Sequence, residues 1–206
     1  MTHEDYTLDE GVFLVTTARH TVESLLKVAG RAPSSEMPKR FREKRGAFVT
    51  IRTCPDSDLR GCIGRPYPSE PLIDAVKDSA VDAAVGDPRF NPVTADELPS
   101  LTFEVSVLTE PVIMEVRSPR EYRSRVVIGR DGVIVRWRGG SGLLLPQVPV
   151  EEKWDIDTYL SYACMKAGAT PDLWLSGQIQ LSTFQAIVFE ETAPAGTVRK
   201  MSLEPI

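Results

Sequence analysis

The sequence has few of the residues from which common metal and nucleophile sites are built. It contains three cysteines, Cys54, Cys62 and Cys164, and two histidines, His3 and His20. The odd cysteine count and the lack of Cys-x-x-Cys spacing argue against a disulfide framework and a thiolate zinc site. We therefore expect reduced thiols, with no metal and no cofactor. Histidine-based catalysis is not expected either, because His3 lies near the N-terminus and His20 within a predicted helix.

Long runs of basic residues and long apolar runs are also absent. The chain of 206 residues has a net charge of −5 and no run of Lys and Arg, so neither nucleic acid nor an anionic membrane is an expected partner. No apolar stretch approaches the ~18 residues of a membrane-spanning helix, and the acidic start argues against a signal peptide. These absences predict a cytoplasmic protein. Its length and its 42% hydrophobic content suit one domain, residues 1–206, with a buried core.

Hydrophobic periodicity predicts about three helices. The first runs from a capping box at residues 7–10 to residue 30. The second runs from Ser69, its expected N-cap, to residue 86, and the third from Asp155 to residue 168.

Segments rich in β-branched and alternating residues predict strands. The segments are residues 46–52, 59–64, 101–108 and 178–190, together with a hairpin across the Asp-Gly turn of residues 126–135. Strands interspersed with helices indicate an α+β fold with a mainly antiparallel sheet or an open barrel. The tail, residues 193–206, is expected to be irregular.

The most unusual stretch is LRGCIG at residues 59–64. In an extended strand its two aliphatic residues share one face, which should contact the core, while Arg60 and Cys62 share the other face, roughly 7 Å apart. Gly61 and Gly64 allow another backbone or a ligand to come close. The stretch therefore predicts a site that holds a thiol beside a guanidinium.

A second strand repeats this two-faced pattern. In residues 101–108, Glu104 and Ser106 lie on the face opposite the apolar side chains. If the two strands lie side by side, Glu104 is the natural partner of Arg60. This pair is either part of a site or a structural ion pair across the sheet.

Three further polar segments are candidates for ligand binding. Asp87 and Arg89 lie in a loop stiffened by two prolines, where they either line a site or pair with each other. The helix N-terminus expected at Ser69 can bind an anion through its free N–H groups. Gln147 is the only polar side chain of an apolar, proline-bent run, and a buried amide needs hydrogen-bond partners.

In these segments the sequence resembles the AMMECR domain family, named for the chromosomal region of Alport syndrome with midface hypoplasia and elliptocytosis. The resemblance is carried first by residues 59–64 and spans nearly the whole chain. The other matching segments are residues 46–50, 87–90, 104–108, 129–132 and 141–149, Trp154, and residues 166–168.

The resemblance implies an α+β protein of two intertwined subdomains with a cleft between them, of the single-domain archaeal or bacterial kind. It brings no known reaction. Members of the family are also found fused to, or encoded beside, a Memo-like protein and a radical S-adenosylmethionine protein. This implies a shared pathway with radical or redox chemistry, and both proteins as partners.

Three functions stay open. In the first, Cys62 is a nucleophile or redox thiol, Arg60 favours its thiolate, and Glu104 or Ser106 places the substrate. In the second, the protein binds a small anion or a peptide through Arg60, Arg89, the helix start after Ser69 and the backbone of the glycines. In the third, Cys62 is a packed side chain and function depends on a protein partner.

Overall fold

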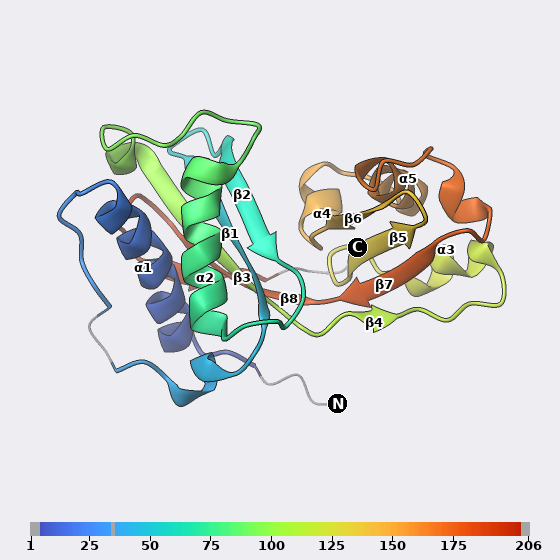
Figure 1. Ribbon diagram of the computed structural model, residues 1–206, viewed down its shortest axis with the longest axis horizontal. Coiled ribbons are helices and arrows are strands. Elements are labelled where there is room, and N and C mark those ends of the chain that lie inside the picture. Colours follow the sequence, from blue (N-terminus) through green and yellow to red (C-terminus); the bar gives the residue numbers. More distant parts are fainter. Residues whose placement is uncertain (1–4, 34–35, 203–206) are drawn as a thin grey trace. The chain divides into compact units, whose positions relative to one another are not determined.

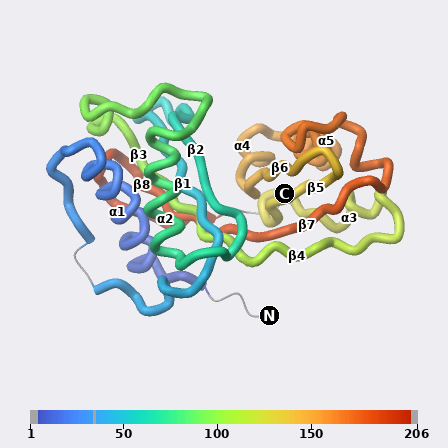
Figure 2. Tube along the Cα trace, viewed as in Figure 1, coloured from blue at the N-terminus to red at the C-terminus, as the bar shows by residue number. Residues whose placement is uncertain are grey.

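The computed structural model describes residues 5–33 and 36–202, so His3 and the last four residues of the expected tail lie outside the described residues. The chain divides into two compact units. The first unit runs to Glu110 and resumes at Ile187–Met201, and the second is built from Pro111–Ala186. Figures 1 and 2 show the elements of each unit.

A five-stranded sheet in the order β2-β1-β3-β8-β9 forms the framework of the first unit. β1 pairs antiparallel with both β2 and β3, and β8 pairs antiparallel with β9. β2 is therefore an edge strand. The strand bounds are β1 Gly46–Thr53, β2 Leu59–Arg65, β3 Leu101–Leu108, β8 Ala186–Glu191 and β9 Val198–Lys200.

Two helices lie side by side over one face of this sheet, as Figure 1 shows: α1 (Leu8–Leu25) and α2 (Leu72–Val81). The predicted capping box begins α1, since the Thr7 hydroxyl accepts from the backbone N–H of Glu10 and the Glu10 side chain accepts from the backbone N–H of Thr7. The apolar faces of both helices pack on the inward side chains of β1 and β3 and form one core.

Shorter helical segments complete the first unit. α2 continues into the π-helical turn η2 (Asp82–Gly86), and two 3₁₀ turns, η1 (Lys39–Arg42) and η3 (Leu98–Ser100), lie in its connections. The residue that caps α2 is Pro71, so the prediction that Ser69 is the N-cap was wrong. Ser69 is exposed, and its hydroxyl bonds to the Tyr67 carbonyl instead.

The second unit has its own sheet, in the order β4-β7-β5-β6. α5 (Ile156–Lys166) packs on it, and its buried residues share a core with β5 and β7. The remaining elements are β4 Val112–Ile113, β5 Gly132–Trp137, β6 Gly140–Leu144, β7 Gln180–Phe184, α3 Tyr122–Arg125, α4 Val148–Glu151, η4 Pro119–Glu121 and η5 Leu173–Leu175.

The α+β class and the antiparallel pairing are confirmed, with some corrections. The described residues contain five α-helices instead of about three, because α3 and α4 have only four residues each and leave no periodic signal. They form two separate open sheets and no closed barrel. Within the stretch expected to be irregular, β9 forms because it pairs with β8.

Two strand predictions were also wrong. The predicted hairpin at residues 126–135 is a turn followed by β5, which begins only at Gly132 and whose hairpin partner is β6. The predicted strand at residues 178–190 is two strands, β7 and β8, which belong to different sheets. In the described part of the chain, no helix has the length and apolar character needed to span a membrane.

Candidate functional site

Cys62 lies in the middle of the edge strand β2, where it is half-buried. Its partner on β1 is Thr50, whose hydroxyl donates a hydrogen bond to the sulfur at 3.4 Å. Cys54, Cys62 and Cys164 form no disulfide. The sulfur of Cys62 is therefore a thiol with a hydroxyl donor held opposite it by the sheet register.

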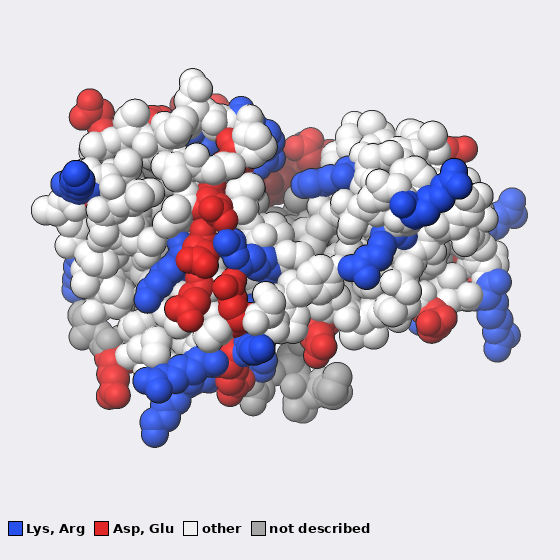
Figure 3. All heavy atoms as spheres, in the orientation of Figure 1, with Lys and Arg blue, Asp and Glu red and all other residues white. Residues whose placement is uncertain are grey.

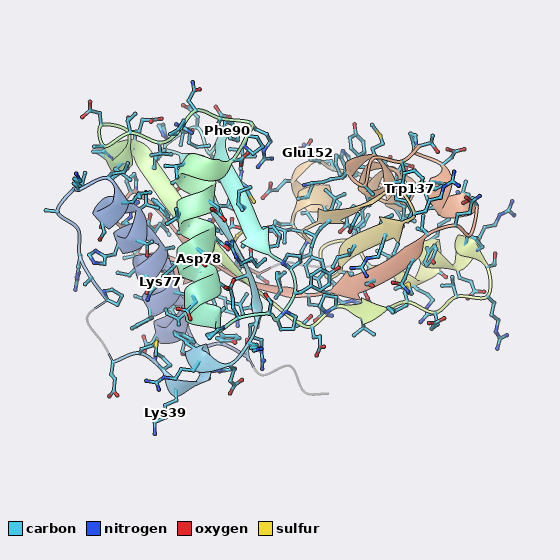
Figure 4. The ribbon with its side chains drawn as sticks, viewed as in Figure 1. Lys39, Lys77, Asp78, Phe90, Trp137 and Glu152 are labelled. Carbon is cyan, nitrogen blue, oxygen red and sulfur yellow. The ribbon has the colours of Figure 1, made fainter. Side chains whose placement is uncertain are left out.

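The outer edge of β2 is covered at Cys62 by the loop that contains Asp87 and Arg89. The backbone N–H of Cys62 donates to Asp87 Oδ2 at 2.9 Å, and Arg89 Nη2 donates to the Cys62 carbonyl at 3.1 Å. These side chains take the place that a neighbouring strand would fill and satisfy both backbone groups of Cys62. Figure 4 labels Phe90, the residue after Arg89 in this loop, near the start of β2.

Asp87 and Arg89 form a two-point ion pair. Arg89 Nε donates to Asp87 Oδ1 at 2.9 Å and Arg89 Nη2 donates to Asp87 Oδ2 at 2.6 Å. The hydrogen bonds from Arg89 lower the pKa of the buried Asp87 carboxyl to about 2, with a further contribution from the Cys62 N–H. The sequence left open whether Asp87 and Arg89 line a site or pair with each other. In the structure they pair with each other, and both also bond to the backbone of Cys62.

Arg60 does not pair with Glu104, so that prediction was wrong. Arg60 Nε and Nη2 donate to the two oxygens of Glu97 at 2.8 and 3.2 Å, and Arg60 Nη1 donates to the Asn91 carbonyl at 2.9 Å. The reason is strand order: β1 lies between β2 and β3, so Arg60 and Glu104 are not on neighbouring strands. The hydrogen bonds from Arg60 lower the pKa of Glu97.

Glu104 instead belongs to a polar row that crosses three strands. Thr50 on β1 is opposite Cys62 on β2 and opposite Glu104 on β3, so the three side chains share one face of the sheet. Cys62 and Glu104 are two strand spacings apart, about 9.5 Å. Ser106 lies next to Glu104 on this face and donates to its Oε1 at 3.4 Å. Thr50, Glu104 and Ser106 are all buried.

The two glycines of the motif serve close packing of protein against protein. A Cβ on Gly61 would lie 2.1 Å from the Ala83 carbonyl oxygen, and one on Gly64 would lie 2.2 Å from the Phe48 ring. Another backbone does approach Gly61, as expected, and it is that of η2.

The motif is also tied to α2 by charge. Arg65, the last residue of β2, forms ion pairs with Glu70 just before α2 at 2.9 Å, with Asp78 on α2 at 4.0 Å and with Asp82, the first residue of η2, at 3.0 Å. Figure 3 shows acidic side chains in a row along α2, and Figure 4 labels Lys77 and Asp78 on that helix. These contacts fix the C-terminal end of β2 to the helix.

The remaining predicted residues lie elsewhere. Gln147 is buried in the second unit, at the residue before α4. Within residues 5–33 and 36–202, the His, Cys, Asp and Glu side chains form no group of three or more that could hold a metal ion. Sequence reasoning missed Thr50 and Glu97. The period-two pattern of residues 46–52 gives the face of Thr50, but only the register shows that it opposes Cys62.

Comparison with known proteins identifies relatives over nearly the whole chain. Protein MJ0810 of Methanocaldococcus jannaschii is 48% identical over 198 residues, which cover 96% of this chain and 98% of the relative. Protein MK0488 of Methanopyrus kandleri is 48% identical over 201 residues, covering 97% of each chain.

A solved structure and a family description agree with these relatives. The crystal structure of the uncharacterized protein PH0010 from Pyrococcus horikoshii matches with a TM-score of 0.89 and 42% identity, over 97% of this chain and 98% of that one. The family described as AMMECR1 matches residues 15–189. The protein therefore belongs to the AMMECR1 family.

Proposed function

We propose that Cys62 is the reactive thiol of an enzyme that acts on a small molecule, with Thr50 and Glu104 as its polar neighbours. The observation that carries the proposal is the hydrogen bond from the Thr50 hydroxyl to the Cys62 sulfur, 3.4 Å long. A donor aimed at sulfur stabilises the negative charge of the thiolate, which is the nucleophilic form.

The rest of the site supports this role in two ways. The main chain of Cys62 is held on one side by β1 and on the other by Asp87 and Arg89, and a fixed backbone preorganises a nucleophile. Glu104, one strand beyond Thr50, presents an acceptor to a donor group of the substrate. In the reaction, the thiol proton leaves to water and the thiolate attacks the carbon of a substrate carbonyl group; the C–S bond forms as the C–O π bond opens, and the carbonyl oxygen takes up a proton from water.

Arg60 has no part in this proposal, because Glu97 and the Asn91 carbonyl take its donors. The cation bonded at Cys62 is Arg89, through the backbone carbonyl. The partner proteins implied by the family resemblance, a Memo-like and a radical S-adenosylmethionine protein, would supply or consume the small molecule. We propose no direct contact with either.

The test is the rate at which iodoacetamide alkylates each cysteine at neutral pH, followed by mass spectrometry. We expect Cys62 to react roughly tenfold faster than Cys54, which is also half-buried. Thr50→Val removes the hydroxyl and keeps the side-chain shape, so it should slow Cys62 severalfold and leave Cys54 unchanged. Equal rates at the two cysteines of the native protein would count against the enzyme.

A second candidate function is the binding of a small anion or a peptide carboxylate. It is favoured by Arg89, whose side chain is 49% exposed beside Cys62. Asp87 neutralises much of its charge, which is why this function comes second. Its test is protection: phosphate or acetate should slow Cys62 alkylation in the native protein, and Arg89→Ala should abolish that protection.

A further inference from the structure

A cavity of about 740 Å³ lies in the first unit and shares no lining residue with the Cys62 site. We call it the α1 cavity. One wall is a face of α1 between Asp9 and Glu23, and the others are residues 29–33, residues 195–198 and Glu191. Its volume is within the range of small-molecule sites.

Arg19 and Glu191 form a fixed ion pair in the lining of the α1 cavity. Arg19 Nε and Nη2 donate to the two oxygens of Glu191, each at 2.6 Å, and Glu191 also accepts from the backbone N–H of Phe103 at 3.0 Å. The Arg19 guanidinium lies over the Phe103 ring. Both charged side chains are almost completely buried, so their positions are set by the fold.

Glu23 also lines the cavity and lacks such partners. It is 9% exposed, and its Oε2 is buried without a hydrogen-bond partner among the residues that the structure describes. Its nearest basic nitrogens are Arg19 Nη1, 3.8 Å from Oε1, and His20 Nδ1, 3.9 Å from Oε2, and both distances are beyond hydrogen-bond range. Arg19 Nη1 likewise donates no hydrogen bond within the described ranges. Buried polar groups in native proteins normally have partners.

We propose that the α1 cavity binds a free α-amino acid with an apolar side chain. An α-amino acid carries its ammonium and carboxylate on one carbon, so both groups reach an acceptor and a donor that lie 3.8 Å apart. The ammonium binds Glu23 and the carboxylate binds Arg19 Nη1. A ligand with only a carboxylate would place that charge near Glu23, and a ligand with only an ammonium would place that charge near Arg19.

The other lining residues fit the rest of such a ligand. Val12, Phe13 and Val198 give the cavity an apolar wall for the side chain. The two other ionisable lining residues, Asp9 and Arg31, are exposed and opposite in sign. The lining holds three acidic residues, Asp9, Glu23 and Glu191, and two basic ones, Arg19 and Arg31, so it offers partners to both charged groups of an α-amino acid.

Isothermal titration calorimetry of the full chain tests this assignment with L-leucine and L-phenylalanine. We expect binding of at least one, and binding roughly tenfold or more weaker for the matching L-amino acid amide and for the deaminated acid. Glu23→Gln should weaken binding by a similar factor. Asp74→Asn, an exposed acidic residue of α2 outside the cavity, should leave binding unchanged.

Thermal unfolding of each variant shows whether it is folded, and Val12→Trp provides a second variant. Val12 is 38% exposed, so an indole there fills the cavity without entering the core, and it should abolish binding. The proposal is overturned if neither amino acid binds at millimolar concentration, if an amide binds as well as its amino acid, or if Val12→Trp binds normally.

Discussion

Asp87 and Cys62, 25 residues apart in the sequence, are joined by a hydrogen bond from the Cys62 backbone N–H to Asp87 Oδ2. The carboxylate thus completes the hydrogen bonding of an edge strand at the residue that carries the thiol. Arg89 supports it from the other side by binding both Asp87 and the Cys62 carbonyl. The loop and the LRGCIG motif therefore work as one structural unit.

Asp87→Asn should lower the free energy of unfolding by about 2 kcal/mol at pH 7, since the pKa of this carboxyl falls from 3.8 to about 2 on folding. A carboxyl with a lowered pKa stabilises the fold above its unfolded pKa and loses that effect as pH falls through its folded pKa. The difference from wild type should therefore shrink between about pH 4 and about pH 2. Urea unfolding at several pH values measures it, with Asp74→Asn as the control. A pH-independent difference would contradict the assignment.

Gly61→Ala should destabilise the first unit by about 2–3 kcal/mol, because the new methyl group would lie 2.1 Å from the Ala83 carbonyl oxygen. That oxygen belongs to backbone and cannot rotate away. Gly86→Ala is the matched control, since its Cβ would meet Asp82 Oδ1 at 3.5 Å, an ordinary contact. Denaturant unfolding compares the two variants. Similar midpoints for both would show that the close approach at Gly61 is not a constraint.

Arg60→Ala should raise the pKa of Glu97 toward its ordinary value and cost about 1 kcal/mol of stability at pH 7, because the pair is partly exposed. It should change the alkylation rate of Cys62 by less than about twofold, since Arg60 bonds to Glu97 and Asn91. The same mass-spectrometric assay used for Thr50→Val measures this. A large drop in the Cys62 rate would restore Arg60 to the thiol site.

Tyr159→Phe should lower the free energy of unfolding of the second unit by about 1 kcal/mol, because the buried Tyr159 hydroxyl donates to the Asp131 carbonyl at 2.9 Å. Burial raises the pKa of this phenol, so the hydroxyl remains a donor at every pH where the protein is folded. Tyr162→Phe, at a site that is 44% exposed, should change stability little. Thermal unfolding of the two variants decides between these outcomes.

Local chemistry was enough to predict much of the fold. The capping box and the helical spacing of apolar residues gave α1, and the cap at Asp155 gave α5, whose Thr158 N–H bonds to the Asp155 carboxylate. Alternation failed in part of β2: a register shift leaves Arg60 out of the pairing with β1 and puts Leu59 opposite Arg52, on the face of Cys62, so the predicted common face of Leu59 and Ile63 was wrong. Along β3 alternation correctly placed Phe103, Val105 and Val107 in the core. These features depend on residues within a few positions of each other, which is why periodicity predicts them.

Long-range contacts alone decided how these elements meet. Alternation fixes which face a side chain takes and says nothing of which strand lies next to it. Because β1 lies between β2 and β3, Arg60 pairs with Glu97 and not with Glu104. The same order places Thr50 opposite both Cys62 and Glu104. The buried pair of Arg19 and Glu191 spans 172 positions, a separation at which local pattern carries no information. The sequence by itself determined the longer helices and the alternating faces of β3, and the tertiary structure decided the partners.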